Sequence, residues 1–133
     1  MTLGQFLRLT LTQAPGVAAI VEDRVYSDIL PQAPEMPAVV FAEIASDEDE
    51  ALDGPTGVSR TSVTVASWAT TRAGAKALSL AVKAILSGYS GGAAGFEVQG
   101  MFLITRRDDF EDETGLYITH QDYEVWTSGV EGA

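Results

Sequence analysis

The sequence contains no cysteine and a single histidine, His120, in 133 residues. Disulfide bonds and cysteine metal ligands are therefore excluded, and one chain cannot build a histidine-rich metal site. Positive charge is also scarce, because eight lysines and arginines stand against nineteen aspartates and glutamates, a formal net charge of −11. Proteins that bind nucleic acid usually present a basic patch, so this balance argues against specific nucleic-acid binding.

Long apolar runs are missing as well. Residues 1–30 lack a basic start followed by an uninterrupted apolar stretch, so no signal peptide is expected, and no run approaches the length of a membrane span. We therefore expect synthesis in the cytoplasm and no membrane partner. A length of 133 residues and 46% hydrophobic content predict one folded domain over residues 1–133.

The clearest structural pattern runs through residues 58–87. Residues 58–70 alternate between two faces and are rich in β-branched side chains, which is typical of a half-buried strand. From Thr71 onward the period changes to that of an amphipathic helix, with Thr70 or Thr71 as N-cap and Gly88 as the left-handed stop. A long strand that leads into such a helix predicts a helix packed on a sheet.

The remaining segments extend this pattern. Residues 2–12 and 17–21 read as helical, residues 24–28 as a brief extended segment, and residues 30–37 as a stiff connector with three prolines. Residues 38–45, 96–105 and 116–127 read as strands. The first is apolar on both sides except at Glu43, and the second is expected to turn Phe102 and Ile104 inward. The sequence predicts an α+β domain whose mostly antiparallel sheet has four to five strands in two hairpins, with two helices on one face.

Two acidic segments are predicted to be loops, at residues 46–57 and 106–115, and residues 128–133 are predicted to form a flexible tail. The simplest interpretation of an acidic run is a solvated loop. Neither run keeps the spacing of an EF-hand, so no dedicated calcium site and no metal or other cofactor are expected. The acidic residues that remain candidates for docking a partner are Asp47, Glu48, Asp49, Glu50, Asp108, Asp109, Glu111, Asp112 and Glu113.

One short motif suggests catalysis. Residues 88–92 read Gly-Tyr-Ser-Gly-Gly and match the G-x-S-x-G pattern of hydrolases, but here the helix precedes the serine instead of following it. His120 and Asp122 share one face of a strand, where a base and its orienting carboxylate are possible. A serine hydrolase that uses Ser90, His120 and Asp122 is kept as a remote alternative, and the expected class is non-enzymatic.

The two tryptophans fall on faces that are otherwise polar. Trp68 has the parity of Arg60 and Thr64, and Trp126 shares its parity with Glu124. Two interpretations remain open: a bulge that turns each ring back into the core, or a contact between subunits.

Several segments resemble a known family. Residues 24–41 (RVYSDILPQAPEMPAVVF), the strand TSVTVASWATT, the helix AGAKALSLAVKAILSG and the final DYEVW are similar to the tail completion and tail terminator proteins of long-tailed phages and phage-like gene transfer agents. The resemblance spans roughly residues 3–126 and includes no catalytic motif.

The resemblance implies a structural virion protein. Such a protein is expected to form a ring, most simply a hexamer, at the head-proximal end of the tail tube. The ring would end tube polymerisation and join the tube protein to the head connector, with DNA passing through as non-specific cargo. In such a ring, the acidic segments at 46–57 and 106–115 are candidates for lining the channel. Trp68, Trp126, Tyr26 and Pro31 are the residues expected at the subunit interface. A head-completion or stopper protein of the same junction is the alternative.

Overall fold

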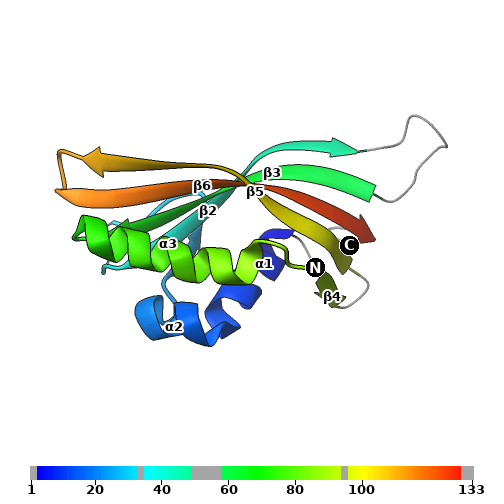
Figure 1. Cartoon of the computed structure of the whole chain (residues 1–133), viewed down its shortest axis with the longest axis horizontal. Helices are drawn as coiled ribbons and strands as arrows, with labels where there is room; N and C mark the ends of the chain where they lie inside the picture. The colour runs from blue at the N-terminus through cyan, green and yellow to red at the C-terminus, as the bar shows by residue number, and fades with distance from the viewer. Residues whose placement is uncertain (1–2, 33–34, 49–57, 94–95, 130–133) are drawn as a thin grey trace.

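The computed structural model describes residues 3–32, 35–48, 58–93 and 96–129. The helices in this part of the chain are α1 (Leu3–Gln13), α2 (Pro15–Val21) and α3 (Arg72–Leu86). The strands are β1 (Val25–Ser27), β2 (Ala38–Glu48), β3 (Val58–Ala69), β4 (Gly91–Ala93), β5 (Phe96–Glu111) and β6 (Leu116–Gly129). They form one sheet in the order β1-β2-β3-β6-β5-β4, and the helices all lie against one of its faces (Figure 1).

The predicted α+β architecture is confirmed. β2 and β3 form one antiparallel hairpin, β5 and β6 form the other, and β3 pairs with β6 between them. Two three-residue strands are added at the edges, β1 parallel to β2 and β4 antiparallel to β5. β4 lies in the glycine-rich segment after α3.

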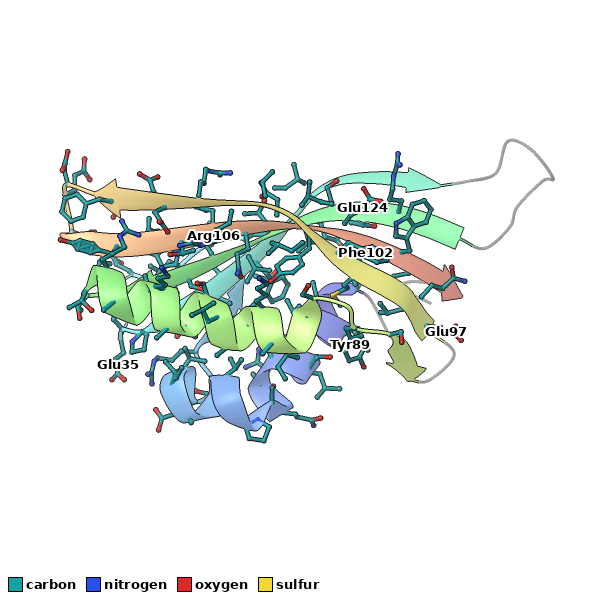
Figure 2. The ribbon with its side chains drawn as sticks, in the orientation of Figure 1. Glu35, Tyr89, Glu97, Phe102, Arg106 and Glu124 are labelled. Carbon is teal, nitrogen blue, oxygen red and sulfur yellow. The ribbon has the colours of Figure 1, made fainter. Side chains whose placement is uncertain are left out.

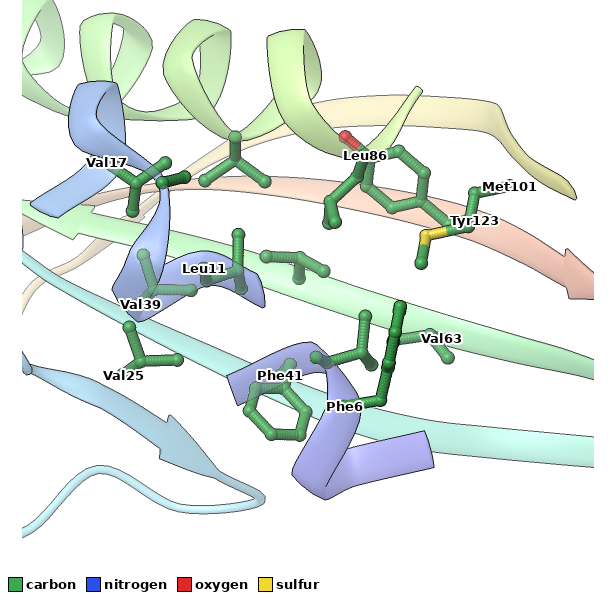
Figure 3. Close-up of a cluster of buried hydrophobic side chains, with 14 of the residues drawn as sticks. Phe6, Leu11, Val17, Val25, Val39, Phe41, Val63, Leu86, Met101 and Tyr123 are labelled. Carbon is green, nitrogen blue, oxygen red and sulfur yellow. The ribbon is translucent and has the colours of Figure 1, made fainter. Parts of the chain in front are cut away.

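The core lies between the helices and the sheet. Leu3, Leu7 and Leu11 of α1 and Leu78, Val82 and Leu86 of α3 are fully buried against strand residues that include Phe41, Val63, Met101 and Tyr123 (Figure 3). The ends of α3 follow the sequence prediction. The Thr71 side chain accepts a hydrogen bond from the Gly74 amide, and Gly88 has φ of +79°.

Three β-bulges interrupt the strand pairing, at Glu43/Ala45 in β2 and at Val98/Gly100 and Leu103/Thr105 in β5. The first bulge in β5 reverses the expected parity of that strand. Met101 is buried in the core, whereas Phe102 is 52% exposed. The prediction that Phe102 and Ile104 point inward was therefore wrong, because the extra residue at this bulge moves the following side chains to the other face. The second bulge, at Ile104, restores the original parity from Thr105 onward.

The second acidic segment is mostly strand. β5 continues through Glu111, and only residues 112–115 form a turn, which corrects the predicted loop at 106–115. The charges that favoured a loop instead pair with neighbours on both faces of the strand, with Asp108 beside Arg72 and Arg106, and Asp109 beside His120. In the first acidic segment, Asp47 and Glu48 belong to β2, whereas Asp49 and Glu50 lie outside the described residues. At the other end of the chain, β6 extends through Gly129, one residue beyond the expected start of the tail.

Within the described residues, none of the helices has the length and apolar content needed to span a membrane.

Candidate functional site

The face of the sheet opposite the helices, here called the open face, carries the candidate site. Because β3 and β6 pair without a register shift, alternate residues of both strands point to this face. They are Arg60, Ser62, Thr64, Ala66 and Trp68 of β3 and Ile118, His120, Asp122, Glu124 and Trp126 of β6. In a two-layer domain, this is the face of the sheet that no helix covers.

A groove crosses the middle of the open face and is here called the trough. It encloses about 500 Å³, and its lining includes Ile44 of β2, Ser62 and Thr64 of β3, Ile104 of β5, and Asp122 and Glu124 of β6. Ile44 and Ile104 are 65% and 59% exposed, and each is the extra residue of a β-bulge. Phe102, which pairs with Glu124, adds a third exposed apolar side chain on the same strand as Ile104 (Figure 2).

A polar network forms the floor of the trough around Asp122. The hydroxyls of Thr64 and Thr105 donate hydrogen bonds to its two carboxylate oxygens at 2.6 and 2.7 Å, and Arg107 lies 3.4 Å away. Desolvation raises the pKa of Asp122, but these hydrogen bonds and the nearby cation outweigh it, so the pKa lies below its ordinary value. The floor of the trough therefore keeps a negative charge at neutral pH.

His120 does not form a catalytic centre with Ser90. Burial and the charge of Arg107 lower the pKa of His120, against the opposing charges of Asp109 and Asp122. Ser90 precedes Gly91, which pairs through Val98 to Thr127, seven residues along β6 from His120. That is about 23 Å along the strand, so the Ser90–His120–Asp122 hydrolase alternative is withdrawn.

The tryptophans lie at opposite ends of the open face. The Trp68 ring is half-buried in a small apolar cluster with Tyr26 and Leu30, and its Nε1 is buried without a hydrogen-bond partner. The Trp126 indole donates to Glu124 at 2.8 Å, and the Arg60 guanidinium lies over its ring. No bulge turns either ring into the main core, so that interpretation was wrong. The subunit-contact interpretation stays a prediction.

Pro31 follows Leu30 directly but is not part of the apolar cluster around Trp68. Its side chain is exposed, whereas Tyr26 is partly buried against the sheet. The four expected interface residues therefore form two separate places on the molecule, with Tyr26, Pro31 and Trp68 toward one end and Trp126 toward the other.

The described acidic residues of β2, Asp47 and Glu48, and the turn between β5 and β6 lie at opposite ends of the sheet (Figure 1). Val58, at the β2–β3 end, pairs with Ser128, whereas Ala69 pairs with Tyr117 near the β5–β6 turn. Eleven residue steps along β3 separate the two places by about 36 Å. The described acidic residues of these two places therefore cannot line one compact site.

The trough could not be predicted from the sequence pattern, because the apolar walls of the trough arise from bulges. A glycine inside an otherwise strand-like run is the one available signal, since it often marks a bulge. Gly100 is such a residue: a Cβ at this position would lie 2.9 Å from the Phe102 ring, so the glycine makes room for the exposed aromatic side chain.

Comparisons with known proteins agree with this fold. A solved chain from the virion of a native gene transfer agent (GTA) particle is similar to this chain, with a TM-score of 0.74, 19% sequence identity and coverage of 96% of each chain. At that identity the likeness shows the fold alone. A search of curated proteins found no match. The family model described as tail completion protein gp17 matches residues 5–128, nearly the whole chain, and the chain therefore belongs to the tail completion protein gp17 family.

Proposed function

We propose that this protein is a structural subunit that forms a ring at the head-proximal end of a phage or gene transfer agent tail tube. The ring ends tube polymerisation and joins the tail to the head connector, and DNA passes through its centre. Family membership over residues 5–128 carries this proposal, and it supports a structural role in a phage tail. The shared fold with a chain of a gene transfer agent virion is consistent with it.

The surface chemistry supports assembly more than catalysis. A closed ring of identical copies needs two different, complementary surfaces on each subunit. The open face offers one of them, because Ile44, Phe102 and Ile104 are each more than half exposed at the middle of the sheet. Exposed apolar side chains grouped in this way are typical of protein interfaces.

The acidic ends of the sheet suggest how the ring interacts with DNA. If the strands run along the channel axis, each copy places Asp47 and Glu48 near one mouth of the channel and Asp112 and Glu113 near the other. Carboxylates do not displace the counterions of DNA phosphates, so DNA slides past such a surface without binding to it. Acidic rings at both openings of the channel are consistent with a passage for DNA.

Tube growth tests the proposal. Purified tube protein is polymerised with and without this chain, and tube length is measured by electron microscopy. We expect shorter tubes with labelled chain at one end only. Phe102→Glu, which places a charge on the open face, is expected to abolish capping, whereas Leu9→Glu is the matched control because Leu9 is 41% exposed on α1.

Two results would contradict the proposal. Tubes of unchanged length with no bound chain would exclude termination. Binding to the head-side adaptor and not to the tube would favour the head-completion or stopper alternative.

A further inference from the structure

The trough has the width of a single helix. Ile44 on β2 and Ile104 on β5 stand on either side of β3 and β6, three strand spacings apart, or about 14 Å. The two isoleucines also lie at about the same position along the strands. Each is the extra residue of a bulge next to the paired residues Val63 and Tyr123. An α-helix with its side chains measures about 10–12 Å across. The two bulged isoleucines therefore stand where a helix lying on the sheet would contact both of them.

The outer side of α3 is the matching surface on the same molecule. Its exposed residues recur at helical spacing and are small or basic apart from one central leucine: Ala73, Lys76, Ala77, Leu80, Lys83 and Ala84. This set is called the α3 stripe. Leu80 is 54% exposed although it is apolar, and the small alanines around it allow the helix to approach a flat surface closely.

Charge distinguishes the α3 stripe from the rest of the chain. Lys76 and Lys83 are the only lysines in the sequence, and α3 has no acidic residue in a chain of net charge −11. The trough floor carries Asp122 and Glu124, with Arg107 beside Asp122. Most surfaces of two copies repel each other at this net charge, so a basic stripe against an acidic floor favours one relative orientation.

We propose that the trough of one copy binds the α3 stripe of a second copy, with Leu80 between Ile44 and Ile104 and the lysines directed to the acidic floor. This inference rests on the proposed ring of identical subunits and names its contact. The stripe belongs to α3, which lies on one side of the sheet (Figure 1), and the trough is on the opposite side, so each copy offers one of each surface. Such a contact is heterologous, joins copies head to tail and closes into a ring when the rotation per copy permits.

The absence of cysteine makes a direct test possible. Leu80→Cys and Ile104→Cys are prepared as separate single variants, mixed under conditions where the wild type assembles, and oxidised. A disulfide forms only when the two Cβ atoms approach within about 4.5 Å. We expect covalent dimers from the mixture and not from a mixture of Leu9→Cys with Ile104→Cys. A chain that carries both Leu80→Cys and Ile104→Cys should give a ladder that ends at the ring.

A second variant keeps the test independent of cysteine chemistry. Leu80→Glu leaves the core intact, because Leu80 points to solvent in the isolated chain, and it should weaken self-association about tenfold or more. Lys83→Glu should weaken it less, and Glu124→Lys in the partner should restore part of the loss.

The outcomes separate the inference from the function. Rings that form at tube ends without any Leu80–Ile104 crosslink overturn the inference and leave the proposed function standing. A photoreactive group at residue 104 that captures tube protein instead of the tryptic fragment 77–83 also overturns it, since another occupant then fills the trough. No self-association, even at tube ends, overturns both.

Discussion

At the scale of single residues, the interior of the α/β interface depends on one buried amide. Gln121 of β6 is 1% exposed, its Nε2 donates to the Ser79 carbonyl of α3 at 3.1 Å, and its Oε1 accepts from the Tyr123 hydroxyl at 3.2 Å. Burial raises the pKa of Tyr123, so the hydroxyl stays protonated and needs an acceptor. Gln121 supplies that acceptor and at the same time fixes α3 on the sheet.

Replacing Gln121 by Met keeps the side-chain length and removes both hydrogen bonds. We expect a loss of about 1–3 kcal/mol in the free energy of unfolding, because the Tyr123 hydroxyl is left buried without a partner. The change is measured by urea denaturation. Gln99→Met is the control, since Gln99 is exposed on β5, and its denaturation midpoint should stay at the wild-type value. Equal midpoints for both variants would contradict this account of the buried network.

At the scale of elements, most of the fold follows from local patterns. The two-residue period of residues 58–70 and the helical period that follows it predict β3 and α3, and Thr71 and Gly88 mark the ends of the helix. Two hairpins with helices on one face are the arrangement that buries these amphipathic elements. The local sequence pattern therefore predicts which segments form strands and which form helices.

The open face could not be predicted from the same patterns. A bulge changes which face a residue occupies without changing the composition of its strand, so Ile44, Phe102 and Ile104 look like core residues in the sequence. The acidic segment at 106–115 was misread for a related reason. A cation from outside the segment contacts it: Arg72 of α3 donates to the Asp109 and Ile118 carbonyls and lies 3.5 Å from Asp108. These are long-range contacts that no local window contains.

The turn between β5 and β6 gives a prediction for DNA transport. Changing Asp112 and Glu113 to lysines should slow the exit of DNA from assembled particles and make it more sensitive to salt, because the new cations displace counterions from passing phosphates. Ejection kinetics at several salt concentrations measure this. Glu22→Lys with Asp23→Lys, at the exposed end of α2, makes the same change in net charge elsewhere. If both double variants release DNA at the same rate, the turn does not face the channel.

At the scale of the whole molecule, the chain is a two-layer slab with unlike faces and charged ends. One face is the open sheet with its trough, the other presents α3 and its lysines, and acidic residues lie about 36 Å apart at the two ends of the long strands. Among the described residues, no group of three or more histidine, cysteine, aspartate or glutamate side chains is arranged to hold a metal ion. We infer that the function lies in how copies pack side by side around a channel.

The number and position of copies on a tail tube test this claim most directly. Tubes assembled with the chain are imaged by electron cryomicroscopy, and the density at their ends is averaged. The account predicts one closed ring of identical subunits, expected to be six, at a single end of each tube, with a continuous central opening. A single monomer at the tube end, or copies scattered along the tube wall, would contradict it.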